Sequence, residues 1–307
     1  MNTTLFPTLH FTPTTGERAL VLGGGGSTGN AWLIGVIAGL FDAGLDVTTA
    51  DLTIGTSAGS TSAAQIAGAT PTELFAATVA AEPQQRTSPT ASHQRPNKPM
   101  ADQLERFLKV IASSEDVTDM RRRMGAAALD REAASDGTWQ AQWRATVASR
   151  LPSQHWPERL VLITAVDAHT GVPVVFDRHS GVDLADAVAA SCAGGGLPYR
   201  IGDTPYLDGG YRANAENADL AVGYERVLVL SPLGGRTLHP LHWGTELAVQ
   251  VDHLRARGSK VETIIPDSES EHMFGANAMD LSMRPAAARA GYDQGVALAD
   301  QLTEFWG

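Results

Sequence analysis

The stretch L-T-I-G-T-S-A-G-S at residues 52–60 constrains the fold of this chain more than any other. Residues 52–54 are apolar or β-branched and predict the end of a buried strand, whereas the small residues 58–67 predict a helix. A serine on a tight turn between a strand and a helix has its hydroxyl exposed. We therefore expect Ser57 to stand at a helix N-terminus, where free N–H groups and the helix dipole favour negative charge.

The two glycines of the turn fit this interpretation. Side chains at Gly55 and Gly59 would clash with the neighbouring strand and helix. The pattern G-x-S-x-G also occurs by chance in glycine-rich turns that have no catalytic role. The segments around it are therefore needed to distinguish a nucleophile turn from such a turn.

A second glycine-rich segment lies between an expected strand at residues 18–22 and an expected helix at residues 30–43. It reads G-G-G-G-S-T-G at residues 23–29. Strand, glycine loop and helix in this order bind phosphate in dinucleotide folds. The same geometry also forms an oxyanion hole, in which backbone N–H groups free of side chains meet a developing negative charge. The glycines alone do not distinguish the two.

The position of the acidic residues around the next strand favours an oxyanion hole over a phosphate-binding loop. A dinucleotide fold places an acidic residue about 20 positions after its glycines, where it holds the ribose. Here Asp42 and Asp46 precede the strand, and the strand ends at the serine turn instead. The end of this strand therefore carries a candidate nucleophile in place of the acidic residue that would bind the ribose.

Composition narrows the function classes. The chain has 307 residues, 43% hydrophobic and 19% charged, enough for a sizeable core. A net charge of −11 argues against nucleic-acid binding and against strong attraction to anionic lipid. One cysteine, Cys192, permits no intrachain disulfide. The N-terminus does not resemble a signal peptide and no apolar run reaches membrane-spanning length, so we expect a cytoplasmic protein.

Strands alternate with helices along the rest of the chain, which predicts a mostly parallel sheet covered on both faces. A hairpin is expected where the strand at residues 160–166 turns into residues 172–176. Further strands are expected at residues 226–230 and 261–265, and helices at residues 71–81, 101–114, 183–192, 239–257 and 285–305.

Residues 83–155 are expected to be a helical insertion over the core. A Pro-rich loop at residues 87–99 precedes an amphipathic helix, in which Leu104, Phe107, Leu108 and Ile111 recur at helical spacing. This apolar face either packs on the core or lines an acyl channel. The basic cluster at residues 120–124 is interpreted as a solvated helix face, and Trp139 and Trp143 as packing residues.

With these segments in view, the chain resembles the patatin-like phospholipases, which carry three motifs in this order. They are a G-x-G-x-x-G loop at residues 24–29, a G-x-S-x-G turn at residues 55–59 and a D-G-[AG] segment at residues 208–210. The likeness spans about residues 18–300 and is weakest over residues 83–155. It implies a three-layer α/β/α sandwich with a mostly parallel sheet, in one domain over residues 1–307.

The resemblance also implies a serine acyl hydrolase that cleaves lipid or related carboxylic esters without a cofactor or metal. Ser57 would attack the ester and Asp208 would accept its proton, which requires burial to raise the pKa of the carboxyl. The implied oxyanion hole is formed by Gly24, Gly25 and Gly26. Gly29, Gly55, Gly59, Gly209 and Gly210 would support the motifs. Transient contact with a membrane surface is compatible with such a substrate.

Two departures from the family pattern concern the walls of the site. Thr28 stands where many members carry an Arg that is thought to fix the glycine loop, which puts the rigidity of the loop in question. Residues 194–196 are all glycine where the family commonly has a Pro.

Several rival interpretations stay open. An ordinary α/β-hydrolase would need a His downstream of its acid, and His239, His242, His253 and His272 meet that order. Lys98, Lys109 and Lys260 are poorly placed for a Ser–Lys mechanism, and Cys192 lies in an apolar helix. A nucleotide-binding protein would use the glycine loop alone. An acyltransferase would share the first half of the hydrolase mechanism.

Overall fold

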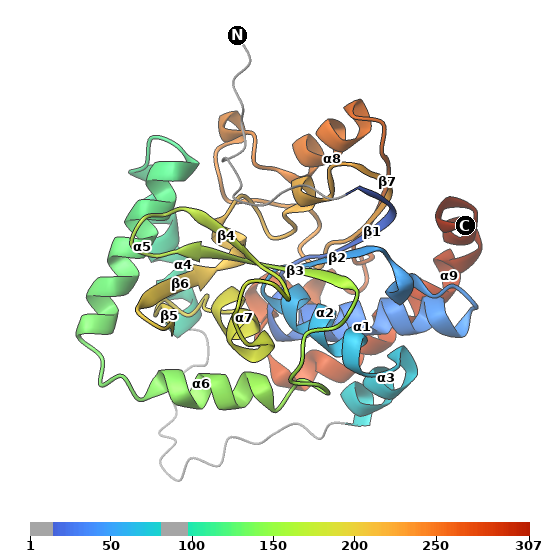
Figure 1. The fold of residues 1–307 in the computed structure, drawn as a ribbon, viewed down its shortest axis with the longest axis horizontal. Coiled ribbons are helices and arrows are strands. Elements are labelled where there is room, and N and C mark those ends of the chain that lie inside the picture. The colour runs from blue at the N-terminus through green and yellow to red at the C-terminus, as the bar shows by residue number, and fades with distance from the viewer. Residues whose placement is uncertain (1–14, 81–97) are drawn as a thin grey trace.

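An eight-stranded sheet forms the centre of the computed structural model, which describes residues 15–80 and 98–307, with the backbone alone for residues 98–103. The strands run in the order β5-β6-β3-β2-β1-β7-β8, and β4 pairs with β3 (Figure 1). They are β1 Gly16–Leu22, β2 Leu52–Gly55, β3 Leu160–Asp167, β4 Pro173–Phe176, β5 Tyr199–Ile201, β6 Thr204–Asp208, β7 Tyr224–Leu230 and β8 Lys260–Ile264.

The helices are α1 Gly26–Asp42, α2 Ala58–Gly68, α3 Pro71–Ala80, α4 Lys98–Ala112, α5 Val117–Ala133, α6 Trp139–Ala148, α7 Leu184–Ser191, α8 Leu247–Ala256 and α9 Arg284–Trp306. The predicted segments come close to α2, α3, α4, α7 and α9. Most of the expected Pro-rich loop at residues 87–99 lies outside the described residues.

Five strands are parallel, β3-β2-β1-β7-β8, as the alternation of strands and helices predicts. Their register aligns Leu22 of β1 with Gly55 of β2 and with Leu230 of β7. Both glycine motifs follow these strand ends. The carboxyl edge of the sheet therefore brings the glycine loop and the serine turn together.

The other three strands are antiparallel and position the third motif. The predicted hairpin forms β3 and β4, and β6 pairs with the other edge of β3. Ala165 of β3 faces Asp208, the last residue of β6. Sequence reasoning gave no strand for β5 or β6, because three and five residues are too short for a clear alternation of side chains.

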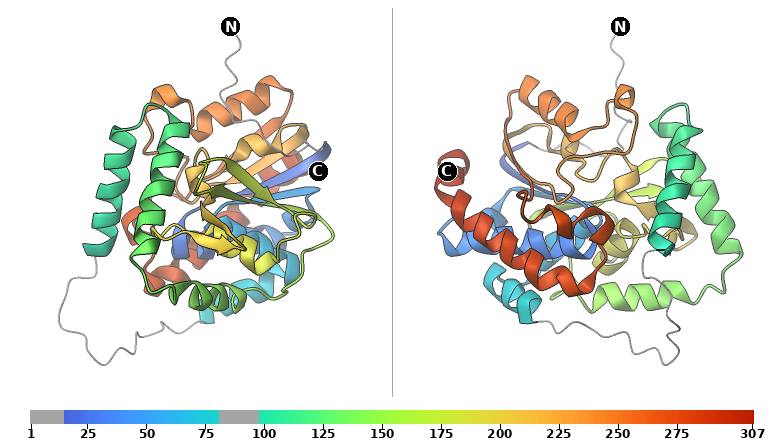
Figure 2. Two further views of the ribbon diagram at one scale, coloured as in Figure 1. Left: turned by 60° about the vertical axis from the view of Figure 1, so that its left-hand side comes forward. Right: turned by 180° about the vertical axis from the view of Figure 1, so that it is seen from behind.

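Side chains that alternate along the strands pack into two separate hydrophobic cores. On β1, Leu20 and Leu22 join a core with α1, α7 and α9, whereas Ala19 and Val21 join a core with α8. Figure 1 and Figure 2 show α1, α2, α3 and α9 on one face of the sheet and α8 on the other. The protein is thus a three-layer α/β/α sandwich with a mostly parallel sheet, as predicted.

Helices α1 and α9 pack with their backbones almost in contact. A Cβ at Gly35 would overlap the Ala288 carbonyl, and one at Gly39 would overlap that of Tyr292. Gly291 and Gly295 of α9 face carbonyl groups of α1 in the same way. Only glycine permits this approach from both sides.

Three expectations need correction. Helix α1 begins at Gly26, four residues before the predicted start, so the end of the glycine loop is already helical. Helix α8 begins at Leu247 and not at His239, because Pro240 and a 3-10 turn at Leu241–Trp243 intervene. Arg121, interpreted as part of a solvated face, is 2% exposed.

The helices α4, α5 and α6 occupy the described part of the expected insertion, and α4 and α5 stand side by side in Figure 2. The small core of α4 and α5 contains Ile111, Met120 and Met124, together with Val166 and Leu207 of the sheet. Arg121 donates to the carbonyls of Gly171 and Arg212, which explains its burial. Leu104 and Leu108 stay exposed, so only part of the amphipathic face packs inward.

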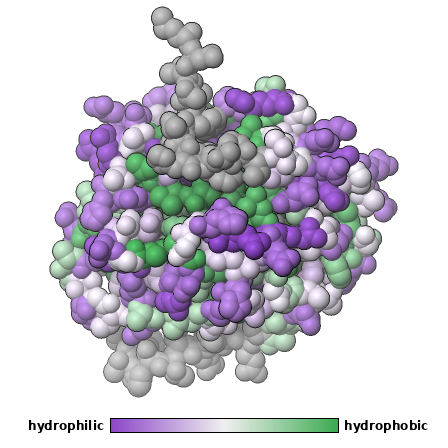
Figure 3. All heavy atoms as spheres, in the orientation of Figure 1, coloured by the Kyte–Doolittle hydropathy of each residue, from purple (hydrophilic) through white to green (hydrophobic). Residues whose placement is uncertain are grey.

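The surface shows both polar and apolar regions. Figure 3 shows hydrophilic side chains around the rim of one face and hydrophobic ones gathered near its centre. Among the helices of the described residues, none combines the length and the apolar character that crossing a bilayer requires.

Candidate active site

Ser57 lies between the end of β2 and the first residue of α2, in the backbone conformation φ 52°, ψ −117°. A non-glycine residue with positive φ is strained, and such strain persists only where the surroundings fix it. A Cβ on Gly55 would come within 2.6 Å of the Cα of Ser60, and one on Gly59 would overlap the Leu22 carbonyl. Both glycines are therefore required by the tight turn, as the sequence predicted.

Three side chains hold the strained peptide groups of Ser57. Its carbonyl accepts hydrogen bonds from Ser60 Oγ at 2.6 Å and from Cys192 Sγ at 3.1 Å. Its N–H donates to Ser191 Oγ at 2.9 Å. Sequence reasoning missed these roles, because Ser191 and Cys192 end α7, more than 130 positions along the chain.

Asp208 meets Ser57 across the edge of the sheet. Ser57 Oγ donates to Asp208 Oδ2 at 2.8 Å, and the Gly210 N–H donates to Oδ1 at 2.8 Å. Burial raises the pKa of Asp208 from 3.8 to about 6, against the lowering effect of these two hydrogen bonds. The carboxyl is thus closer to a useful base at neutral pH than a free Asp.

Glycines leave room for the Asp208 side chain. A Cβ on Gly194 would come within 3.0 Å of Oδ2, and one on Gly209 would overlap Thr164. Of the three glycines at residues 194–196, Gly194 therefore lies closely against Asp208, where the sequence suggested only a departure from the family pattern.

A buried polar network lies behind the D-G-G segment. Asn217, in the left-handed conformation at φ 55°, donates through Nδ2 to Thr56 Oγ1 and to the Gly209 carbonyl, both at 3.0 Å. Thr56 Oγ1 also lies 2.9 Å from Thr164 Oγ1. The network connects the serine turn, β3 and the segment after Asp208. No sequence motif indicates it.

The glycine loop lies next to Ser57, and its N–H groups differ in their availability. Gly24 is close to Ser57, since a Cβ there would lie 3.4 Å from that of Ser57. However, the Gly24 N–H donates to the Ala215 carbonyl at 2.8 Å. Within the described chain, the N–H groups of Gly25 and Gly26 have no acceptor. Of the three glycines assigned to the oxyanion hole, two therefore remain as candidate donors.

The loop packs closely against Pro232 and forms backbone hydrogen bonds. A Cβ on Gly25 would come within 2.6 Å of Pro232 Cβ, and Gly26 has φ 65°. The Gly29 N–H donates to the Gly25 carbonyl, and the buried Thr28 donates through its N–H to the Ala278 carbonyl.

A guanidinium group from α9 holds the first turn of α1. Arg284 donates through Nη1 to the Ser27 carbonyl at 2.6 Å and through Nη2 to Asn30 Oδ1 at 3.1 Å. Asn30 in turn donates to Ser62 Oγ and to Gln65 Oε1 of α2, at 2.8 and 2.9 Å. These bonds tie the helix of the glycine loop to the helix of Ser57.

The histidines that could serve a rival α/β-hydrolase triad either form hydrogen bonds with other residues or lie on the surface. His239 Nδ1 pairs with Thr245 Oγ1 at 2.9 Å, and burial lowers the pKa of His239 to about 4. His272 Nδ1 lies 2.8 Å from the Glu269 carbonyl, and His242 and His253 are exposed. Both carboxylate oxygens of Asp208 are occupied by Ser57 and Gly210.

The Cys192 thiol is a poor alternative nucleophile. Burial raises the pKa of the Cys192 thiol to about 11, which disfavours the reactive thiolate. Among the side chains of residues 15–80 and 104–307, no group of His, Cys, Asp and Glu is arranged to hold a metal ion.

Solved structures similar to this chain include VipD and the type III effector protein ExoU. VipD from Legionella pneumophila is 12% identical with a TM-score of 0.41, and the match covers 94% of this chain and 67% of VipD. The type III effector ExoU is 17% identical with a TM-score of 0.36, and the match covers 94% and 54%. ExoU in complex with SpcU, from Pseudomonas aeruginosa, is 14% identical with a TM-score of 0.36, and the match covers 94% and 53%. The chain thus spans about half the length of ExoU.

No curated protein matches the chain. The family model described as patatin-like phospholipase matches residues 20–221, which include the glycine loop, Ser57 and Asp208. This range is more than half of the chain, and the chain therefore belongs to the patatin-like phospholipase family.

Proposed function

We propose that the protein is a serine acyl hydrolase that cleaves carboxylic esters of lipids with a Ser57–Asp208 dyad. Membership of the patatin-like phospholipase family supports lipid hydrolysis in general. The observation that carries the finer proposal is the 2.8 Å hydrogen bond from Ser57 Oγ to Asp208 Oδ2, on a strained turn next to free backbone N–H groups. A hydroxyl becomes an effective nucleophile when a base accepts its proton in this way.

The proposed reaction has two halves. Asp208 accepts the proton of Ser57 while Oγ attacks the ester carbonyl, and the N–H groups of Gly25 and Gly26 bind the oxyanion that forms. Collapse of this intermediate expels the alcohol, which takes the proton from Asp208, and leaves an acyl-serine. Asp208 then accepts a proton from water, whose oxygen attacks the acyl group. The proton finally returns to Ser57 as the fatty acid leaves.

A fluorophosphonate probe and a soluble ester test the proposal. Ser57 should displace fluoride from the probe and become labelled, whereas Ser57→Ala should remain unlabelled and retain the wild-type melting temperature. The turnover of p-nitrophenyl esters by Ser57→Ala should fall below about a thousandth of the wild-type rate. The exposed Ser149 is a matched control, and Ser149→Ala should keep both labelling and turnover. An unlabelled wild-type protein, or an active Ser57→Ala, contradicts the nucleophile.

A further inference from the structure

Met279 places an exposed sulfur atom against the glycine loop. It lies in the segment between β8 and α9, and its side chain is 57% exposed. A Cβ on Gly26 would come within 3.0 Å of Met279 Sδ and within 2.8 Å of the Ala278 carbonyl oxygen. The same carbonyl accepts the Thr28 N–H at 3.0 Å, which attaches this segment to the first turn of α1. The sulfur therefore lies beside a candidate donor of the oxyanion hole.

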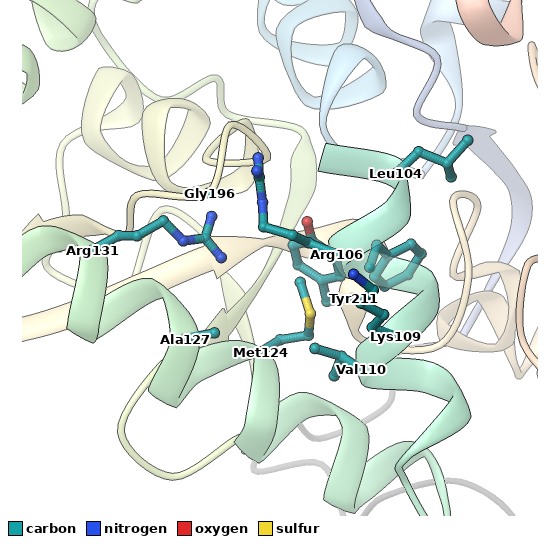
Figure 4. Close-up of a pocket in the computed structure, with 10 residues that line it drawn as sticks. Leu104, Arg106, Lys109, Val110, Met124, Ala127, Arg131, Gly196 and Tyr211 are labelled. Carbon is teal, nitrogen blue, oxygen red and sulfur yellow. The ribbon is translucent and has the colours of Figure 1, made fainter. Parts of the chain in front are cut away.

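The other methionine side chains that the structure describes are less exposed. Met120, Met124 and Met273 are at most 8% exposed, and Met283 is half-buried. Met124 lines a cavity of about 350 Å³ between α4 and α5, a volume that admits a small peroxide (Figure 4). Exposure governs the oxidation of thioethers, so Met279 is the first candidate for oxidation and Met124 its strongest competitor.

The Cys192 thiol does not compete for an oxidant. Thiols react with peroxide as thiolates, and burial raises the pKa of Cys192 to about 11. Its Sγ also donates to the Ser57 carbonyl at 3.1 Å. A thioether has no proton to lose, so the reaction of Met279 needs no such ionisation. Among the sulfur atoms of the described side chains, that of Met279 is therefore the most open to a peroxide.

We propose that Met279 is an oxidation site and that its sulfoxide inactivates the enzyme by occupying the oxyanion hole. Hydrogen peroxide gives one oxygen atom to the sulfur lone pair, its O–O bond breaks, and the other oxygen leaves as water. The sulfur is oxidised and the peroxide is reduced. The new S=O oxygen is a hydrogen-bond acceptor next to Gly26, whose N–H has no acceptor in the described chain.

The effect on activity rests on the proposed function, whereas the oxidation itself does not. An N–H group that bonds to the sulfoxide is no longer available to the oxyanion. Loss of one such donor lowers kcat about 10²–10³-fold. The oxyanion exists only in the transition state, so KM should change much less than kcat.

Peroxide treatment of three proteins tests the proposal. When Met279 of the wild type is fully converted to the sulfoxide, as mass spectrometry of its peptide shows, kcat for a p-nitrophenyl ester should fall at least about a hundredfold. Methionine sulfoxide reductases should restore it. Met279→Leu should keep its own untreated turnover, whereas Met124→Leu, the matched control, should lose activity as the wild type does. An unmodified Met279, or equal inactivation of Met279→Leu, overturns the inference.

A spectroscopic measurement separates this inference from the proposed function. In Ser57→Ala protein made with isotope-labelled glycine, oxidation should shift the amide resonance of Gly26 and leave that of Gly137, which has no close neighbour, unchanged. Met279→Leu in the same background should show no shift. A shift at Gly26 combined with a wild type that hydrolyses no ester contradicts the dyad and retains the oxidation site. A Met279 sulfoxide that leaves the Gly26 resonance in place overturns the inference.

Discussion

Replacing Asp208 by Asn should stabilise the protein at alkaline pH while removing its activity. Burial raises the pKa of Asp208 from 3.8 to about 6, so ionising this carboxyl costs more in the folded than in the unfolded protein. The contribution of Asp208 to stability is fully present below pH 3.8 and is lost as the pH rises through about 6. Asn does not titrate and retains the full contribution.

The two pKa values give the magnitude. Their difference, at about 1.4 kcal/mol for each unit, corresponds to roughly 3 kcal/mol above pH 7. Asn can preserve both contacts, since its oxygen accepts from the Gly210 N–H and its amide donates to Ser57 Oγ. Glu216, whose pKa burial raises to about 7, is present in both proteins and cancels in the comparison.

Thermal melting of the wild type and Asp208→Asn across pH 4 to 8 measures the effect. We expect a melting temperature about 6 °C higher for Asp208→Asn at pH 8, with the gap closing towards pH 4. In parallel, kcat/KM of the wild type should rise with pH through about 6 and then level off, because Asp208 must be ionised to accept the proton. A gap that is absent at pH 8, or that is the same at pH 4 and pH 8, refutes the reasoning.

Three further predictions concern the surroundings of the dyad. Gly25→Ala should lower kcat at least about tenfold with little change in KM. The Cβ of the new alanine would meet Pro232 and displace an N–H group that binds the oxyanion. Stopped-flow kinetics with a p-nitrophenyl ester would check this. Arg284→Ala should lower kcat more than KM and reduce stability by about 1–3 kcal/mol, by leaving two acceptors unpaired. The exposed Arg289→Ala on the same helix should change neither, and equal kinetics for both variants would exclude the positioning role. His239→Gln should retain kcat within a few-fold, whereas a folded but inactive variant would favour a triad hydrolase.

The sequence predicted the parts of the site that depend on local backbone geometry. A serine between a strand and a helix of small residues permits few conformations, so the turn at Ser57 followed from its neighbours in the chain. The position of Asp208 needed the family motif, because β6 is too short to be recognised and its pairing with β3 is a long-range contact.

The supporting contacts were not predictable from sequence patterns. Arg284 lies more than 250 positions from Ser27, and nothing in its own segment indicates a partner. Arg121 stands among arginines of which two are exposed, and its burial depends on carbonyls that the fold brings together. Hydrogen bonds between distant segments leave no periodic signal, so only the structure shows them.

The match to the family model ends at residue 221. The close backbone contact between α1 and α9 shows that the matched segment depends on residues beyond this boundary. Strands β7 and β8 and helix α9 all follow it, yet β7 pairs along the whole of β1. A protein cut at residue 221 would leave β1 as a sheet edge and open the glycine face of α1 to water. The segment that the family model matches is therefore smaller than the segment that builds the sheet and its helices. Any exchange between relatives has to carry residues 224–306 along with the motifs.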